Sequence, residues 1–497
     1  MSSNEINELI KYYSAEFDYT KKETVIILAA GHGKRIKSQT SKMLHKIWES
    51  PTVERVFNAC LNSLGNANII IVVGIKADEV IRTVGKKMSV IYAYQAEQKG
   101  TGHAVQVALE KIDSSKYDGT VYVFPGDMGL IDSTTINYFR DSLIQSQSDM
   151  IVLTGIFEGR IEDNYYGRIV RVPANKSKNE ISDKNGNVIE IIEYKDIMNL
   201  ESTKPYKVKY KKKVITFKKK ALIENREFNS GVFAFKYQKL NELIKMIGEN
   251  NIQKEIYLTD LVYLFNHNGY AVSAVSPKNQ YVLTGFNNKS VLKEMDAVAR
   301  KLIYDKLKDI IEIDDPDDFF IDESVVNEIM ELDGKGIPLD IRIGKGVYIG
   351  KDAKLNFNLS IMKNVFINGA INFGKNILIR ENTQLSCFYG QRIEIGDNTE
   401  IFGGNIIKGN VKIGKHSMIE SGVRITGSDD YPVVIGENVT IKGVTYIFGS
   451  LIEDHIHLEH SVIIRKNISK PQNAKQDIYK VRYYLPEAEG IDAIKNL

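Results

Sequence analysis

Cysteine is scarce in this sequence, since only Cys60 and Cys387 occur among 497 residues. Two cysteines are too few for a disulfide scaffold, and such low usage is typical of a reducing compartment. Long apolar runs are also missing: stretches such as residues 68–75 are far shorter than the roughly 20 residues of a membrane-spanning helix. The first residues, MSSNEINELIKYY, lack the apolar core of a secretory signal. These absences predict a cytoplasmic protein with no membrane partner.

Neither sign of charge is in large excess. The chain has 66 Lys and Arg residues against 63 Asp and Glu residues, a formal net charge of +3. This balance gives no reason to expect a protein that coats polyanions, so we expect no nucleic-acid partner. Hydrophobic residues make up 43% and charged residues 26%, which is typical of a globular protein. A chain of this length predicts two or three domains.

The first half of the chain alternates short apolar strands with longer amphipathic stretches. Helices are expected at 51–65 and 102–112, between strands at 24–30, 68–74, 90–94, 120–126 and 149–156. This alternation indicates crossover units and an α/β, Rossmann-like domain with a mainly parallel sheet. Ligands collect at the carboxyl ends of such strands, where Gly31–Gly33 and Gly126–Asp127 both lie.

After Gly334 the apolar pattern changes to a period of six residues. Apolar residues recur at every sixth position through 343–385, 395–425, 435–447 and 452–464, and the phase slips between these runs. Neither a helix nor an ordinary strand has this period, and its length is typical of a left-handed parallel β-helix of hexapeptide repeats. We expect the first slip, after Leu385, to be a four-residue insertion that forms a projecting loop.

These patterns divide the chain into five segments. We predict an N-terminal helical extension, an α/β domain, a linker helix with a loop, the left-handed β-helix and a charged tail, at residues 1–22, 23–288, 289–334, 335–468 and 469–497. The extension is expected to be helical because Ile6, Leu9, Ile10 and Tyr13 recur at helical spacing.

The turn after the first predicted strand reads LAAGHGKRIKSQTSKMLHKI, from Leu28 to Ile47. Glycines directly after a strand let backbone N–H groups approach a phosphate chain, and Arg35 and Lys42 can then neutralise its charge. Both the Walker motif GxxxxGK[ST] and the Rossmann motif GxGxxG are missing, so on the glycines alone an ordinary turn is an equal alternative.

The same stretch resembles the opening signature of bacterial N-acetylglucosamine-1-phosphate uridyltransferases, within the wider sugar-1-phosphate nucleotidylyltransferases. Further matches follow in order: QAEQKGTGHAV (95–105), GD (126–127), YGRI (166–169), IIEYKD (191–196), FNSG (228–231), EIYLTD (255–260) and GFNN (285–288). The resemblance implies that residues 23–288 are a nucleotidyltransferase domain. Its substrates would be UTP and N-acetylglucosamine-1-phosphate, and its products UDP-N-acetylglucosamine, a cell-wall precursor, and pyrophosphate.

The resemblance also assigns roles to the matching residues. Arg35 and Lys42 would be the catalytic cations on the phosphates. Asp127 and Asn287 would hold a Mg2+ cofactor, with Asn287 also among the substrate-binding residues. The other substrate-binding residues would be Ala29, Ala30, Gly31, Gln95, Gln98, Gly100 and Thr101 for the nucleotide, and Gly167, Glu193 and Asn229 for the amino sugar. One aspartate and one asparagine suit magnesium, which keeps most of its positions for water and phosphate.

Each of these residues also has an ordinary structural explanation. Asp127 can cap a turn, Asn287–Asn288 can form one, and Glu193 with Lys195 can be a surface pair. Their joint occurrence in this order favours the site. Ala29–Ala30 favours uridine, because many relatives that transfer other nucleotidyl groups have two glycines there.

The sequence departs from the family pattern at several places. Lys34 replaces the usual threonine, Ser41 the usual proline, and PGDMG (125–129) the usual Tyr-Gly-Asp-x-Pro. Since that tyrosine lies near the substrate in the family, Pro125 leaves the exact sugar open. An insertion with the sequence KVKYKKKVITFKKK (207–220) predicts a basic hairpin beside the sugar site. Its basic face can attract an anionic substrate or partner, but we favour an ordinary solvated face.

The β-helix lacks the acetyltransferase motifs of the bifunctional bacterial family, namely an RLRPG-like segment, a histidine near Tyr-Leu-Gly-Asp and an NYDG loop. We expect its histidines to be structural rather than catalytic or metal-binding: His416, His455, His457 and His460. The β-helix is then a scaffold, and the resemblance implies a homotrimer. Three alternatives stay open: an enzyme that also acetylates glucosamine-1-phosphate from acetyl-CoA, a transferase for another sugar-1-phosphate or nucleotide, and a non-catalytic nucleotide-sugar sensor.

Overall fold

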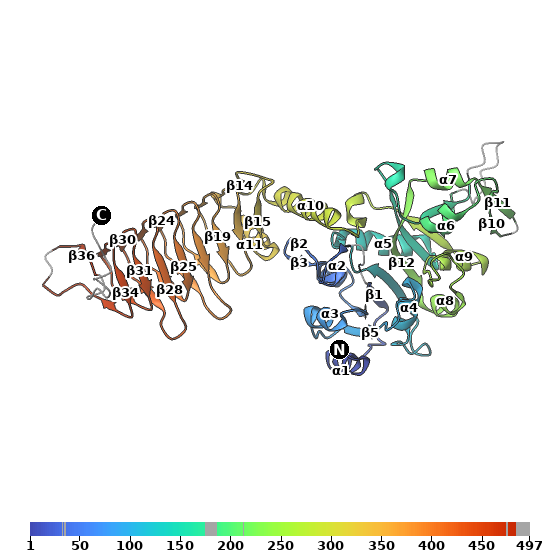
Figure 1. Cartoon of the computed structure of the whole chain (residues 1–497), viewed down its shortest axis with the longest axis horizontal. Helices are drawn as coiled ribbons and strands as arrows, with labels where there is room; N and C mark the ends of the chain where they lie inside the picture. The colour runs from blue at the N-terminus through green and yellow to red at the C-terminus, as the bar shows by residue number, and fades with distance from the viewer. Residues whose placement is uncertain (32, 34–35, 174–185, 212, 474–475, 484–497) are drawn as a thin grey trace, which may run out of the picture. The chain divides into compact units, whose positions relative to one another are not determined.

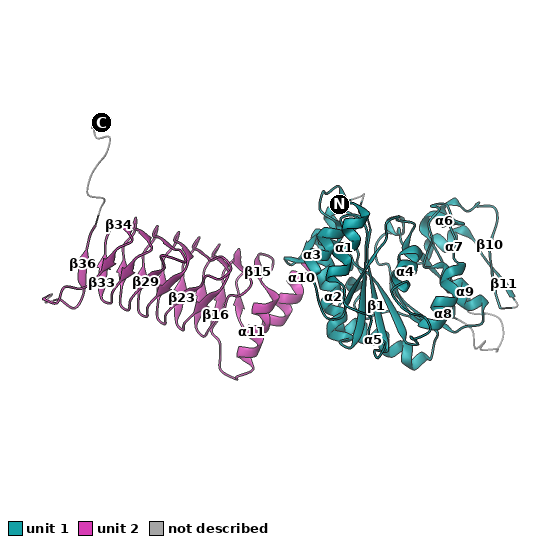
Figure 2. Ribbon diagram, turned by 90° about the horizontal axis from the view of Figure 1, so that it is seen from below, with its two compact units in different colours: residues 1–295 teal, residues 296–497 magenta. Residues whose placement is uncertain are grey.

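The computed structural model describes residues 1–31, 33, 36–173, 186–211, 213–473 and 476–483 (Figure 1). The chain forms two compact units, unit 1 at residues 1–295 and unit 2 at residues 296–497, coloured separately in Figure 2. Of the described helices, none combines the length and the apolar character that crossing a bilayer would require.

Unit 1 is built on one large sheet with the order β13-β7-β12-β6-β1-β4-β5. Its strands are β1 (Glu23–Ala29), β4 (Ala67–Val73), β5 (Val90–Tyr94), β6 (Thr120–Pro125), β7 (Met150–Ile156), β12 (Glu227–Lys236) and β13 (Val272–Val275). β1 runs parallel to β4 and β6, whereas β12 runs antiparallel to β6 and β7. The prediction of a mainly parallel α/β sheet is confirmed, and its first five strands fall where the sequence places them.

Helices cover both faces of this sheet. Successive side chains of its buried strands point to opposite faces, and both faces are apolar. Val25 and Ile27 of β1 pack with α2 (Thr52–Ser63), α3 (Ala77–Val84) and α5 (Ser133–Ser146). Ile26 packs on the other face with α4 (Thr101–Leu109), α8 (Tyr237–Leu243) and α9 (Asp260–His267). The N-terminal helix α1 (Ser3–Tyr13) starts with a capping box and adds Ile6 and Ile10 to the first of these two cores.

The insertion between Asp196 and Asn229 builds a small layer of its own beside the sheet. It contains the end of α6 (Tyr194–Asn199), the antiparallel hairpin of β10 (Tyr206–Tyr210) and β11 (Lys213–Phe217), and α7 (Lys219–Glu224). Val208 and Tyr210 turn inward and share a separate core with β8 (Arg168–Arg171) and β9 (Val188–Ile192). Lys207 and Lys209 alternate with them and are exposed, so the predicted hairpin has one apolar and one basic face.

Unit 2 is a left-handed parallel β-helix, as predicted, and its short strands stack into three parallel sheets (Figures 1 and 2). The first sheet has the order β14-β16-β18-β21-β24-β27-β30-β33-β36, the second β15-β17-β19-β22-β25-β28-β31-β34, and the third β20-β23-β26-β29-β32-β35. The strands used below are β16 (Ile341–Ile343), β17 (Val347–Ile349), β20 (Ile371–Phe373), β23 (Ile393–Ile395), β25 (Ile406–Gly409), β26 (Val411–Ile413), β28 (Arg424–Gly427), β29 (Val433–Ile435) and β33 (Ile456–Leu458).

The coil length explains the six-residue period of the sequence. Asn358 bonds Asn376, 18 residues further on, so one coil holds three six-residue repeats. Asn376 bonds Asn398, 22 residues further on, which places the four-residue insertion predicted after Leu385 inside that coil. These asparagines have positive φ angles, near 54° to 58°, which asparagine tolerates better than most residues and which the coil corners require.

The first strands of the β-helix lie inside the segment that the sequence analysis assigns to a linker. The linker helix α10 spans Lys289–Leu307, and β14 (Glu312–Ile313) and β15 (Phe319–Ile321) then pair with β16 and β17. The coil therefore begins before residue 335. Helix α11 (Glu323–Asp333) interrupts the repeat between these strands, so the sequence shows no six-residue period there. In the tail, β36 (Tyr479–Val481) adds to β33.

Candidate active site

A cavity of about 620 Å3 opens at the carboxyl ends of β1, β5 and β6. It is lined by ten of the residues predicted from the sequence: Ala30, Gly31, Lys42, Gln95, Gln98, Gly100, Thr101, Glu193, Asn229 and Asn287. Three predicted residues lie just behind this lining. Asp127 contacts Lys42, Gly167 faces Glu193, and Ala29 is only 1% exposed in the core, so it can act through its backbone alone. Arg35 lies outside the described residues.

One wall of the cavity carries two glutamine amides. The Gln95 Nε2 donates to Gly100 O at 3.1 Å and lies 3.2 Å from His103 Nδ1. The Gln98 Nε2 donates to the carbonyl oxygen of Ala30. Amide side chains offer both donors and acceptors, which is what the edge of a nucleobase requires. His103, which the sequence analysis did not single out, orients one of these amides from the first turn of α4.

Glycine is required where α4 begins. Gly100 has a φ of +107°, and a Cβ there would lie 2.5 Å from the carbonyl oxygen of Ile256. Thr101 follows, and its hydroxyl accepts the backbone N–H of Leu258 at 3.2 Å. The start of α4 is therefore fixed against the segment 255–260, so that the EIYLTD and GTGHAV motifs meet in space although they lie far apart in sequence.

Lys42, Asp127 and Asn287 meet at one point in the site. The Lys42 Nζ donates to Asp127 Oδ2 at 2.5 Å and to Asn287 Oδ1 at 3.1 Å. The same ammonium lies 5.4 Å from the centre of the Phe286 ring. A Cβ on Gly285 would lie 3.2 Å from the Asp127 carboxylate, so this glycine leaves room for it. Three segments that are distant in sequence thus place two oxygens and one cation together.

Glu193 and Asn229 also line the cavity, and Glu193 faces Gly167. A Cβ on Gly167 would lie 3.2 Å from both carboxylate oxygens of Glu193, so the carboxylate faces the bare backbone of that glycine. The Asn229 N–H donates to Gly167 O at 2.9 Å and fixes this backbone. Thr259 donates from its hydroxyl to Glu193 Oε1 at 3.2 Å. Thr259 lies within the EIYLTD motif, and only the fold shows which partner it has.

The Asp127 and Asn287 side chains fit a divalent cation. Their oxygens already share one positive charge, that of the Lys42 ammonium, so they converge on a point that a cation can occupy. Two oxygens, one of them anionic, match the few protein ligands that magnesium accepts beside water and phosphate. In the described part of the chain, no group of three or more His, Cys, Asp or Glu side chains is arranged to hold a metal.

Comparison with known proteins shows the family of the chain. Residues 25–163 match the family described as MobA-like NTP transferase domain. The chain is 32% identical over 372 residues to the bifunctional protein GlmU of Caldanaerobacter subterraneus subsp. tengcongensis, covering 75% of this chain and 70% of that protein. The chain belongs to the GlmU family. The family resemblance inferred from the sequence motifs is thereby confirmed.

Other GlmU proteins match over a smaller share of their length. The chain is 35% identical over 308 residues to that of Acetivibrio thermocellus, covering 60% of this chain and 57% of the relative. The chain is 31% identical over 333 residues to the GlmU protein of Thermoanaerobacter pseudethanolicus, covering 66% of this chain and 64% of the relative. The aligned segments thus leave out a third or more of these two relatives.

Three partly buried acids, Glu190, Glu193 and Asp260, have raised pKa values, and Glu193 lines the cavity of this GlmU-type site. Burial raises the pKa of Glu190 to about 7 and that of Glu193 to about 7, against an ordinary value of 4.5. It also raises the pKa of Asp260 to about 6. Glu190 Oε1 accepts the Tyr206 hydroxyl at 3.0 Å, but its Oε2 is buried with no partner among the described residues. The hairpin insertion supplies Tyr206 and so helps to cover this carboxyl group.

Replacing Glu190 with glutamine is expected to stabilise the protein at pH 8 but not at pH 5. The pKa of Glu190 is higher in the folded protein than in the unfolded chain, so the unfolded chain releases this proton first as the pH rises. The free energy of unfolding therefore decreases between about pH 4.5 and about pH 7. Glutamine carries no charge and can still accept from Tyr206. We expect a gain of about 1–2 kcal/mol at pH 8, less than the full shift implies because the side chain is partly exposed.

Urea unfolding at the two pH values measures this effect. The matched control is Glu201→Gln, since Glu201 is exposed and pairs with Lys204. If Glu190→Gln changes the free energy of unfolding no more than Glu201→Gln does, at pH 5 and at pH 8 alike, the Glu190 carboxyl group is not held protonated by burial.

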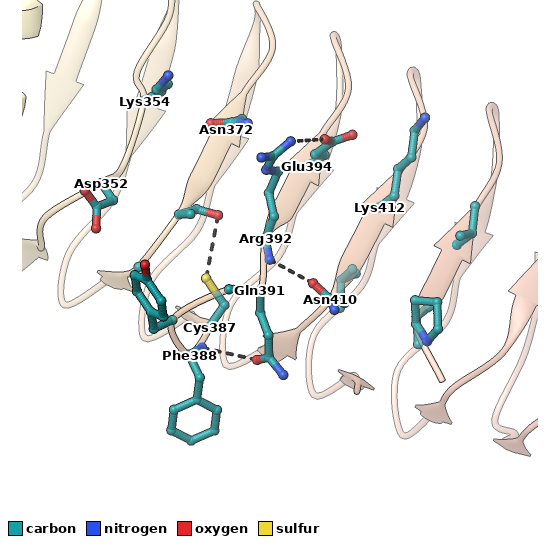
Figure 3. A pocket seen from close by; sticks show the side chains of 18 of the residues that line it. Asp352, Lys354, Asn372, Cys387, Phe388, Gln391, Arg392, Glu394, Asn410 and Lys412 are labelled. Carbon is teal, nitrogen blue, oxygen red and sulfur yellow. Dashed lines mark hydrogen bonds and ion pairs between the residues drawn. The ribbon is translucent and has the colours of Figure 1, made fainter. Parts of the chain in front are cut away.

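The β-helix carries a second cavity, of about 900 Å3, on the outer face of β20, β23, β26 and β29 (Figure 3). Lys354, Arg392 and Lys412 line it, and Arg392 pairs with Glu394 at 3.5 Å. A loop with Phe388 and Tyr389, both highly exposed, borders it. The Cys387 thiol contacts Ala370 O, and burial raises its pKa, so this thiol is not an activated nucleophile.

The histidines of the β-helix occupy its corners and edges. His416, His455 and His460 have positive φ angles, the conformation that asparagine adopts at other corners. The His460 Nδ1 lies 2.8 Å from Gly443 O, and His457 lies 3.2 Å from Glu459. Glu459 is also paired with Lys480 and Arg482 of the tail. Structural contacts therefore account for the side chains of His457 and His460.

Proposed function

We propose that unit 1 is a uridylyltransferase that forms UDP-N-acetylglucosamine and pyrophosphate from UTP and N-acetylglucosamine-1-phosphate. The observation that carries the proposal is the meeting of Lys42, Asp127 and Asn287 at a cavity that is also lined by the amides of Gln95 and Gln98 and by Glu193 and Asn229. An anion-neutralising point thus shares one cavity with amides suited to a base and with polar groups suited to a sugar. Membership of the GlmU family and the MobA-like domain match support the same reaction class.

The binding residues hold the two substrates for an in-line reaction. Gln95 and Gln98 would hydrogen-bond the base, while Gly31 and Gly33 let the phosphate chain approach the backbone after β1. Asn229 and Glu193 would accept and donate hydrogen bonds to the amino sugar. Their fixed positions align the sugar phosphate with the α-phosphorus of UTP, and such positioning supplies much of the rate in phosphoryl transfer.

The reaction needs no protein base, because the attacking group is already an anion. A phosphate oxygen of N-acetylglucosamine-1-phosphate forms a bond to the α-phosphorus of UTP, and the bond from that phosphorus to the oxygen bridging to the β-phosphate breaks. The electron pair leaves with pyrophosphate. Lys42 would neutralise charge that develops on the phosphates. A Mg2+ ion held by Asp127 and Asn287 would add Lewis-acid stabilisation of the same charge.

Pyrophosphate release tests the proposal directly. Whole protein with UTP and Mg2+ is offered a panel of sugar-1-phosphates and, in parallel, CTP, ATP, dTTP or GTP in place of UTP. We expect release with UTP and N-acetylglucosamine-1-phosphate, and at most a few per cent of that rate with glucose-1-phosphate. Release with another pair alone would move the function to that substrate, and silence throughout would favour a non-catalytic sensor.

A second candidate function is acetylation of glucosamine-1-phosphate by the β-helix. Two observations favour it: the matched relatives are named bifunctional, and the cavity on the β-helix carries unpaired Lys354 and Lys412 among the described contacts. Acetyl-CoA plus glucosamine-1-phosphate in the same assay distinguishes the two. Pyrophosphate release that is lost without acetyl-CoA would establish this activity.

A further inference from the structure

We propose that Lys42 is the internal counter-ion of the metal site. In the nucleotide-free protein its ammonium takes the position between Asp127 and Asn287, and a divalent cation binds there only when a phosphate chain draws the ammonium away. The inference deepens the proposed function, since it rests on Asp127 and Asn287 being the metal ligands. It assigns Lys42 a role in the order of binding besides its role in catalysis.

The Lys42 ammonium contacts two oxygens and lies near one aromatic ring. Lys42 is 9% exposed, and its Nζ donates to Asp127 Oδ2 at 2.5 Å and to Asn287 Oδ1 at 3.1 Å. The Phe286 ring lies 5.4 Å away, a distance suited to a cation–π contact. An ammonium has three N–H donors, and these two oxygens accept from two of them. Both contacts compete with a phosphate for the same ammonium.

The ligands are held in place, whereas the ammonium can move. Gly285 packs against the Asp127 carboxylate, and Gly33 packs against the Lys42 Cβ, where a side chain on that glycine would lie 2.8 Å away. The base of the lysine side chain is therefore fixed. Beyond the Cβ, the methylene chain has rotatable bonds that can carry the ammonium to another anion. Phosphates bound at Gly31 and Gly33, in the same cavity, would be such an anion.

The consequence is competition between two cations for one position. A divalent cation at the point where the Lys42 ammonium contacts Asp127 Oδ2 and Asn287 Oδ1 would lie against a second positive charge, so the two cations compete for these oxygens. If Lys42 contacts both oxygens for roughly 90–99% of the time in the nucleotide-free protein, the affinity of the site for a metal is weakened roughly ten- to a hundred-fold. A bound triphosphate offers Lys42 another partner and relieves the competition. The metal then enters with the nucleotide and is retained poorly without it.

Direct metal binding tests this inference without turnover. Whole protein without nucleotide is titrated with Mn2+, and free Mn2+ is followed by its EPR signal. We expect Lys42→Met to bind Mn2+ about ten- to a hundred-fold more tightly than the wild type. Lys42→Arg, which keeps the charge, should show no such gain. The matched control is Lys46→Met, since Lys46 lies on the same segment and pairs with Glu49 at the surface.

Two further titrations place the effect at this site. Adding UTP should narrow the difference between the wild type and Lys42→Met to about three-fold or less. The double variant Lys42→Met/Asp127→Asn should lose the tightened binding. Lys42→Gln is measured beside Lys42→Met, so that a folding defect of either variant, detected by circular dichroism, does not decide the result.

Each outcome is decisive. Binding by both neutral variants no tighter than by the wild type would overturn the proposal, as would a gain that survives the Asp127→Asn change. The two assays separate this proposal from the proposed function. No pyrophosphate release from any substrate pair, together with tighter Mn2+ binding by Lys42→Met, would reject the reaction but support the counter-ion role of Lys42.

Discussion

The Asp127→Asn variant is expected to release pyrophosphate at least about a hundred times more slowly than the wild type, with its fold intact. Asparagine keeps the size and one oxygen of the side chain but removes its negative charge. A magnesium ion binds an anionic carboxylate oxygen much better than a neutral amide oxygen in the same position. The variant also removes the anionic partner of the Lys42 ammonium, 2.5 Å away. Under the proposed reaction, both changes weaken the point at which charge on the phosphates would be neutralised.

The measurement is steady-state pyrophosphate release at saturating UTP and sugar phosphate, over a range of Mg2+ concentrations. A lost metal ligand should raise the Mg2+ concentration needed for half the maximal rate and lower the maximum itself. The matched control is Asp132→Asn. Asp132 caps α5 by accepting from Thr135 N at 2.7 Å, and asparagine caps equally well. Near-wild-type turnover of Asp127→Asn at ordinary Mg2+ concentrations would remove Asp127 as a metal ligand.

The β-helix was predictable because its period is a direct record of its geometry. Each coil of 18 residues presents three inward positions six residues apart, so Ile343, Ile349 and their successors had to be apolar. The strands β14 and β15 escaped prediction because α11 separates them from the repeat, so their pairing with β16 and β17 leaves no period in the sequence. A periodic signal therefore marks the interior of a solenoid better than its first coil.

The location of the site was predictable from motif order, but its contacts were not. Parallel strands bring their carboxyl ends to one edge, so Gly31, Gln95 and Asp127 had to lie near each other. The bonds of Lys42 join residues 85 and 245 positions apart, and no local pattern records them. The raised pKa of Glu190 likewise comes from burial that only the fold shows, and the hydrogen bond from Tyr206 of the insertion partly opposes it.

Replacing Gly409 with alanine is expected to destabilise the β-helix by about 3–5 kcal/mol, near the upper end for single substitutions. Gly409 ends β25 beside Gly427 of β28, and a Cβ there would lie only 1.8 Å from the carbonyl oxygen of Gly427. No rotamer can relieve a clash between a Cβ and a backbone atom, so the two coils must separate locally. The φ of +81° adds a smaller conformational cost.

Gly422→Ala separates the steric cost at Gly409 from the conformational one. Gly422 has a nearly equal φ of +76°, but nothing lies within 4 Å of the position its Cβ would take. Its substitution should therefore cost only about 1–2 kcal/mol. Hydrogen exchange of residues 406–427 in the whole chain, beside thermal unfolding, measures both variants in the coils concerned. If the two substitutions lower the free energy of unfolding equally, the coils do not approach at Gly409 as closely as the structure shows. If Gly409→Ala lowers it by about 2 kcal/mol or more beyond Gly422→Ala, close coil contact rather than backbone conformation requires glycine at position 409.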